Sequence, residues 1–225
     1  MAFTNEYLSA AQKRKLKAKN SLETANTIIL GIVTLAVIWC SYQSHVWGSI
    51  QTFRLAESHK WYRMSHEKNL TTVQHAAMDE TIAAGFVRDV TEKRDDRVKF
   101  LLEGVRPELS SILKAWLAKQ PLQNANAPDH PMATKEYLDL LDNGFAEAKK
   151  YSTTAEWYYA QAEEADINSD GYNLFAVIFS ILMFLVAITT KITQVRLGLT
   201  LVIFSGLTCI ILLAVLFSSM PLAIK

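Results

Sequence analysis

The acidic string Asp166–Gly171 is the part of the sequence whose residue types and spacing come closest to a known chemistry. It reads D-x-N-x-D-G, the opening of a calcium loop in which side-chain oxygens alternate along the turn. Such a loop needs a bidentate Glu at its twelfth position, where this chain has Val177. The string therefore does not predict an EF-hand, and we expect Asn168, Ser169 and Asp170 to end one helix or cap the next. The alternative left open is a weak cation site made of Glu163, Glu164, Asp166 and Asp170.

Histidine and cysteine spacing does not indicate a zinc site or a catalytic nucleophile. His59 and His66 are seven residues apart, roughly 10 Å along a helix, which is too far to share one ion. Cys40 and Cys209 both stand in apolar runs, where a thiolate is costly. The sequence also lacks a nucleophile elbow and a glycine-rich phosphate loop. We therefore expect a protein that is not an enzyme, with no catalytic, cofactor-binding or metal-binding residues and no cofactor.

The sequence contains three uncharged apolar runs, over residues 24–42, 172–190 and 197–217. Any functional site of this chain must be positioned by the segments that these runs form. At ~1.5 Å per residue each reaches roughly 28–32 Å, the thickness of the hydrocarbon core of a bilayer. A chain of 225 residues is too short to bury three such helices in a soluble core. No small-x-small cleavage site follows the first run, which argues against a secretory signal. The runs predict three transmembrane helices.

Charge is segregated along the chain, although the formal net charge is only +1. Residues 1–26 carry five Lys or Arg and two acids, residues 27–190 carry fifteen and twenty, and residues 191–225 carry three and none. Basic residues concentrate on the cytoplasmic side of membrane proteins. The pattern predicts a cytoplasmic N-terminus, an external middle region and an internal loop between the second and third spans. A net charge near zero argues against a nucleic-acid partner.

The middle region shows helical periodicity and no strand alternation. We expect a long helix from Trp47 towards Gly104, with Gly85 and Gly104 as candidate breaks. Residues 107–120 predict a short amphipathic helix with Pro107 in its first turn, followed by an irregular loop over residues 121–131. The return leg shows a heptad seam, which predicts burial of Phe145 and Tyr159 between helices. That seam comprises Leu138, Leu141, Phe145, Ala148, Ser152, Ala155, Tyr159 and Ala162.

The layout resembles a group of uncharacterised bacterial three-pass integral membrane proteins with a helical extracytoplasmic module. The resemblance rests on the motif S-Y-Q-S-x-x-W at residues 41–47, the run W-L-A-x-x-P-L-x-N-x-x-A-P at residues 116–128, and the acidic entry into the second span at residues 162–172. It implies three passes and an external helical module. It implies no activity and no site residues.

These observations predict an all-α membrane protein with three transmembrane helices and an extramembrane antiparallel helical hairpin between the first and the second. The expected location is the bacterial inner membrane, in contact with the lipid bilayer. We expect the chain to form a homo-oligomer, and its expected protein partner is a membrane or periplasmic protein. The expected role is self-assembly or partner binding by the external module. The alternative is an oligomeric ion channel or pore-forming effector gated by the extramembrane helices, with Thr200, Ser205 and Thr208 lining the pore. The expected segments are 1–23 basic and cytoplasmic, 24–42 span one, 43–171 external helical domain, 172–190 span two, 191–196 cytoplasmic loop, 197–217 span three and 218–225 external tail.

Overall fold

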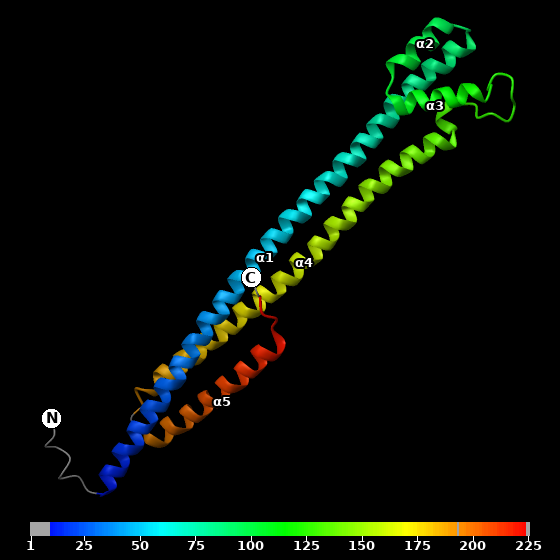
Figure 1. The fold of residues 1–225 in the computed structure, drawn as a ribbon. Helices are drawn as coiled ribbons and strands as arrows, with labels where there is room; N and C mark the ends of the chain where they lie inside the picture. Colours follow the sequence, from blue (N-terminus) through cyan, green and yellow to red (C-terminus); the bar gives the residue numbers. More distant parts are fainter. Residues whose placement is uncertain (1–9, 193, 224–225) are drawn as a thin grey trace. The chain divides into compact units, whose positions relative to one another are not determined.

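The computed structural model describes residues 10–192 and 194–223, and their regular structure is entirely helical. This confirms the prediction of an all-α fold. The helices α1, α4 and α5 are long and apolar enough to cross a membrane, which suggests a multi-pass membrane protein in contact with a lipid bilayer. The helices are α1 (Ala10–Thr91), α2 (Asp95–Gly104), α3 (Pro107–Ala118), α4 (Lys135–Thr189) and α5 (Val195–Ser219), with a single 3₁₀ turn, η1 (Pro131–Ala133) (Figure 1).

The chain divides into two compact units, and both α1 and α4 contribute to each. Unit 1 comprises Met1–Arg54 and Ala160–Lys225, and unit 2 comprises Leu55–Tyr159. In unit 1, segments of α1, α4 and α5 pack around a core that includes Val33, Phe179 and Leu216. The outer faces of the same helices are also apolar, with Leu35 68% exposed and Ile210 66% exposed. Such a surface is favourable in lipid and unfavourable in water.

The chain after α5 folds back onto unit 1. The carbonyl oxygen of Pro221 accepts hydrogen bonds from Trp47 Nε1 and from the Tyr172 hydroxyl, both at 3.2 Å. The backbone N–H of Ala223 donates to Oε1 of Gln43 at 3.0 Å. Gln43 is only 2% exposed, so this bond gives a buried amide a partner that it would otherwise lack.

In unit 2, α1 and α4 lie side by side and are joined by direct hydrogen bonds (Figure 1). The Ser58 hydroxyl donates to the Ala155 carbonyl at 2.9 Å, and the Ser65 hydroxyl donates to the Ala148 carbonyl at 2.7 Å. These bonds bring serine side chains onto the opposite backbone, which requires a small residue at each contact. The alanines of the predicted seam fulfil that requirement.

The other half of the predicted seam is wrong by one residue. Phe145 is 40% exposed and Tyr159 is 53% exposed, so neither is buried between the helices. The residues just before two seam positions face α1 instead: Gly144, before Phe145, lies against Thr72, and Tyr151, before Ser152, packs on Trp61 with ring centroids 5.7 Å apart. The periodicity of seven is present, but the close approach of α1 leaves space for glycine where the sequence pattern suggested phenylalanine.

The short helix α3 lies at the centre of a second hydrophobic core, in unit 2. It begins at Pro107, as predicted, and its apolar face, including Leu109, Leu113 and Trp116, is buried with Phe86 of α1. The Trp116 indole donates to the Pro128 carbonyl at 2.7 Å, which fixes the loop that follows α3. Between Gln120 and η1 that loop has no regular structure, as predicted.

Two predicted helix boundaries are wrong. Gly85 lies inside α1, and the helix ends instead at Thr91, where Lys93 adopts a left-handed φ of 58°. Arg94 N–H bonds to the Asp89 carbonyl and Lys93 N–H to the Val90 carbonyl, the pattern of a Schellman cap. Residues 168–170 neither end nor begin a helix, because α4 continues through them. Packing of unit 1 on α4 outweighs the weak helix propensity of Asn, Ser and Asp.

Candidate functional site

The acidic string does not form a cation site in the structure. Glu163, Glu164, Asp166 and Asp170 point from exposed positions on α4, and Asn168 is buried. Ser169 exchanges hydrogen bonds with Ser44 of α1, at 3.2 Å between hydroxyls and 3.0 Å to the Ser44 carbonyl. Within residues 10–192 and 194–223, no three His, Cys, Asp or Glu side chains gather closely enough to hold a metal ion. The string thus contributes to helix pairing.

The predicted seam residues that α1 leaves uncovered form a stripe along one flank of α4. Leu138, Phe145 and Tyr159 are 51%, 40% and 53% exposed, and Ser152, the fourth member at the same spacing, is half-buried. Residues seven apart lie on nearly the same side of an α-helix, two turns from one another. We call these four residues the α4 stripe. Its large apolar side chains have the character of a protein contact surface.

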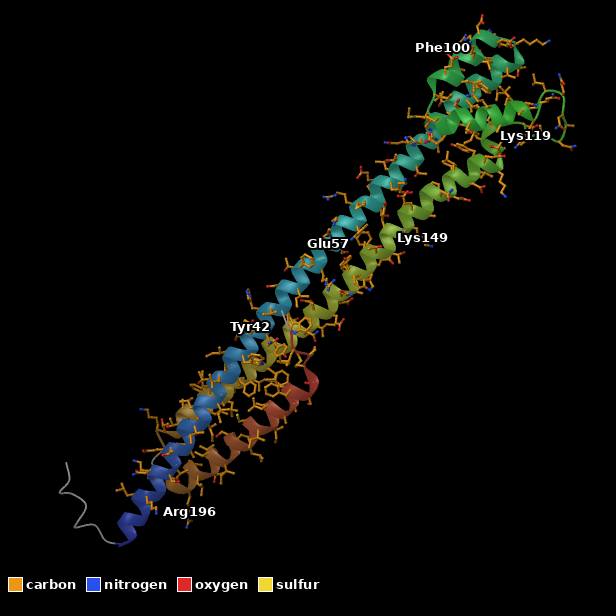
Figure 2. All side chains as sticks on the ribbon, in the orientation of Figure 1. Tyr42, Glu57, Phe100, Lys119, Lys149 and Arg196 are labelled. Atoms are coloured by element: carbon orange, nitrogen blue, oxygen red, sulfur yellow. The ribbon has the colours of Figure 1, made fainter. Side chains whose placement is uncertain are left out.

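A groove between α1 and α4 lies beside Phe145. Tyr62 and His66 of α1 and Lys149 of α4 line it together with Phe145. Tyr62 is 42% exposed, so one side of the groove offers an aromatic ring to solvent. Lys149 is labelled on α4 in Figure 2. The rings of Tyr62 and Phe145 thus lie beside the Lys149 ammonium group and the His66 imidazole. Such a surface favours contact with a second aromatic or acidic surface.

An ion pair next to the groove holds α1 and α4 in register. Lys68 Nζ lies 2.6 Å from Glu147 Oε2, and the Tyr151 hydroxyl donates to Glu147 Oε1 at 2.9 Å. The hydrogen bond from Lys68, followed by that from Tyr151, lowers the pKa of Glu147. Glu147 is therefore kept ionised, as a partner that orients two side chains.

Sequence reasoning missed a buried ion pair of unit 2. Asp79 of α1 is 2% exposed. Its carboxylate accepts hydrogen bonds from Nε and Nη2 of Arg106, the residue before α3. Burial, then the charge of Asp79 and a hydrogen bond with it, raise the pKa of Tyr137 to about 12. The three residues are 27 and 31 positions apart in sequence, so no local motif signals them. They join α1, α3 and α4, and the arrangement is that of a satisfied buried ion pair.

The polar residues expected to line a pore do not share one exposed face of α5. Thr200 is exposed, Thr208 is half-buried, and Ser205 is 2% exposed with its hydroxyl donating to the Leu201 carbonyl at 2.8 Å. Cys209, one turn further along, is also buried against the other helices. Small residues on this helix therefore serve packing within unit 1.

Comparison of the chain with protein-family models, with curated proteins and with solved structures gave no match.

Proposed function

We propose that this chain is a non-enzymatic, multi-pass protein of the bacterial inner membrane that self-assembles through its helical module. The observation that carries the proposal is the α4 stripe, with Leu138, Phe145 and Tyr159 exposed at intervals of seven residues. An apolar row at this spacing is the kind of face that pairs two helices. Self-association covers it without a further partner.

The groove beside the stripe supports a second copy of the same chain as the occupant. In a two-fold symmetric pair, each copy offers the same patch, so that a residue on one meets the complementary feature on the other. Phe145 and the groove lined by Tyr62 are adjacent on one face, and a two-fold axis near Phe145 brings each phenylalanine to the opposite groove. Such an interface has an aromatic centre and a polar rim.

The proposed topology has the N-terminus in the cytoplasm and the hairpin formed by α1 and α4 in unit 2 outside it, between the first and second spans. The basic residues before the first span and between the second and third support it, because they are retained on the cytoplasmic side. The resemblance to bacterial three-pass proteins supports the choice of the inner membrane. A reporter that is active only outside the cytoplasm, fused after Lys225, is expected to be active; activity of a cytoplasm-only reporter at that position contradicts the topology.

The assembly test compares Phe145→Glu with Phe100→Glu in the full-length protein in detergent. Both phenylalanines are exposed, but Phe100 is 74% exposed and lies on α2, not on α4 (Figure 2). Light scattering is expected to give about twice the chain mass of 25.3 kDa for the wild type and for Phe100→Glu, and the single-chain mass for Phe145→Glu. A monomeric wild type, or a Phe145→Glu variant that remains a dimer, overturns the proposal.

A further inference from the structure

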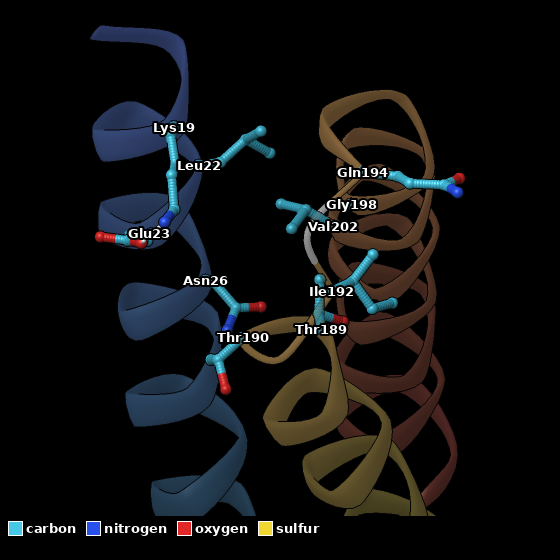
Figure 3. Close-up of a pocket in the computed structure, with 10 residues that line it drawn as sticks. All are labelled: Lys19, Leu22, Glu23, Asn26, Thr189, Thr190, Ile192, Gln194, Gly198 and Val202. Atoms are coloured by element: carbon cyan, nitrogen blue, oxygen red, sulfur yellow. Dashed lines mark ion pairs between the residues drawn. The ribbon is translucent and has the colours of Figure 1, made fainter. Parts of the chain in front are cut away.

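A small cavity opens in unit 1 where the three candidate spans end. It lies between α1, the last turn of α4 and the first turn of α5, and its volume is about 50 Å³ (Figure 3). A single water needs roughly 10–15 Å³ measured in this way, so the cavity takes a few waters or one small polar group. Asn26, Thr189 and Gly198 stand on its walls. All three are buried and form its inner wall, whereas the lining residues Lys19, Glu23, Thr190 and Gln194 are exposed, so the cavity opens to the surface on that side.

Asn26 presents an unused hydrogen-bond acceptor to the cavity. Its Nδ2 donates to the Val186 carbonyl near the end of α4 at 3.1 Å, and this bond fixes which end of the amide is nitrogen. Its Oδ1 is buried and has no partner among the residues that the structure describes. Figure 3 shows this oxygen directed into the space in front of Ile192 and Gly198. Asn26 is only 3% exposed, so leaving this buried acceptor without a hydrogen bond is costly. A donor on a bound group would remove that cost.

The opposite wall has the features that attract an anion. Gln194 precedes α5 and gives it no side-chain cap, so backbone N–H groups of the first turn lack an intrahelical partner. Gln194 and Gly198, on either side of this first turn, line the cavity, so the positive end of a 25-residue helix lies at its edge. Lys19 and Glu23 both line the cavity and form an ion pair at 3.8 Å. The excess positive charge comes from Lys191 and Arg196, which do not line the cavity but stand next in sequence to, or within two residues of, the lining residues Thr190, Ile192 and Gln194.

Gly198 provides the room. It is buried, yet a Cβ placed on it would meet nothing within 4 Å. A buried residue with open space at this position marks the wall of a cavity and not a helix contact. Gly206, further along α5, differs in this respect because its Cβ would lie 3.4 Å from Ile29 Cδ1.

We propose that an anionic phospholipid of the polyol type binds here, with a headgroup hydroxyl entering the cavity to donate to Asn26 Oδ1 and the phosphate outside it, at the α5 N-terminus. The location supports a lipid source, because the ends of transmembrane helices lie at the depth of the headgroups. The acceptor selects a headgroup that carries a donor besides its phosphate. The positive surroundings select a net negative headgroup over a zwitterionic one.

The test measures lipid binding to the purified full-length protein in detergent by native mass spectrometry. Phosphatidylglycerol is compared with phosphatidylmethanol, which has the same charge and phosphodiester but no hydroxyl. The wild type is expected to bind phosphatidylglycerol about five- to tenfold more tightly, the gain from one buried hydrogen bond. Equal binding of the two lipids overturns the proposal. Binding of soluble glycerol phosphate that displaces phosphatidylglycerol at equal concentration also overturns it, because the source is then a free phosphate ester.

Two glycine variants provide the matched pair. Gly198→Leu fills the cavity and improves helix propensity, so it is expected to fold and to lose the preference for phosphatidylglycerol. Gly31→Leu adds the same side chain to another open position, on the exposed face of α1, and is expected to keep the preference. If Gly198→Leu binds phosphatidylglycerol as the wild type does, the cavity is not the site. Because neither glycine lies in unit 2, dimer mass is expected to remain unchanged in both, which separates this result from the assembly test.

Discussion

Arg106 and Asp79 form a bidentate ion pair in unit 2, in which Arg106 Nε donates to Asp79 Oδ1 at 3.2 Å and Arg106 Nη2 donates to Asp79 Oδ2. The Asp79 side chain is 3% exposed and that of Arg106 is 27% exposed, so most of the pair is removed from water. The contact joins the residue before α3 to α1 near the C-terminal end of that helix. It fixes where the α3 core sits on the long helix.

Breaking this pair from one side should destabilise unit 2 strongly. Arg106→Met leaves a buried carboxylate without its cation, and we expect a loss of about 3–5 kcal/mol in the free energy of unfolding. The double variant Asp79→Leu/Arg106→Met removes both charges and should recover much of that loss. Thermal unfolding in detergent measures both. A double variant as unstable as the sum of the single variants would contradict the assignment.

Close packing of α1 on α4 should make Gly144 intolerant of a methyl group. A Cβ on Gly144 would lie 2.7 Å from Thr72 Oγ1 and 2.9 Å from Thr72 Cγ2, so either the Thr72 side chain turns away from its bond to the Lys68 carbonyl or the helices separate. We expect Gly144→Ala to lower the free energy of unfolding by about 1–3 kcal/mol. Gly85→Ala is the matched control in unit 2, because nothing lies within 4 Å of its Cβ, and it should raise stability by about 1 kcal/mol through helix propensity. Equal effects in chemical denaturation would refute the close contact.

The end of α1 carries backbone strain that glycine should relieve. Lys93 has φ 58° at the position of a Schellman cap where glycine is the usual residue. Lys93→Gly should therefore raise the melting temperature, by a gain of about 1 kcal/mol. Lys99→Gly, in the middle of α2, is the control and should lower stability by a similar amount because its backbone is helical. A lower melting temperature for Lys93→Gly would contradict the cap geometry.

Tyr137 should make unit 2 sensitive to alkaline pH. Its pKa is raised from the usual 10.0 to about 12, chiefly by burial and then by Asp79. The neutral phenol is the form favoured in the fold, so its contribution to stability is complete below pH 10. That contribution is lost as pH rises from 10 to about 12, because the unfolded chain ionises first. Tyr137→Phe should show a smaller loss of stability than the wild type over this interval, measured by thermal unfolding; identical pH profiles would contradict it.

The sequence by itself determined which parts are helical and which helices are apolar enough to cross a membrane, because both properties depend on composition and local periodicity. It also predicted the Pro107 start of α3 and the period of seven on α4. The period did not reveal which neighbour of each alanine faces α1. That choice, Gly144 over Phe145, depends on how closely Thr72 approaches.

Only the tertiary structure decided the features that join residues distant in the chain. Asp79 and Arg106 look like ordinary surface charges in sequence, and packing of α3 on α1 is what buries them. Asn26 looks like one polar residue at the start of an apolar run, and its free acceptor is visible only where α4 and α5 meet α1. Such contacts form between segments that are far apart in the sequence, so local residue types do not encode them.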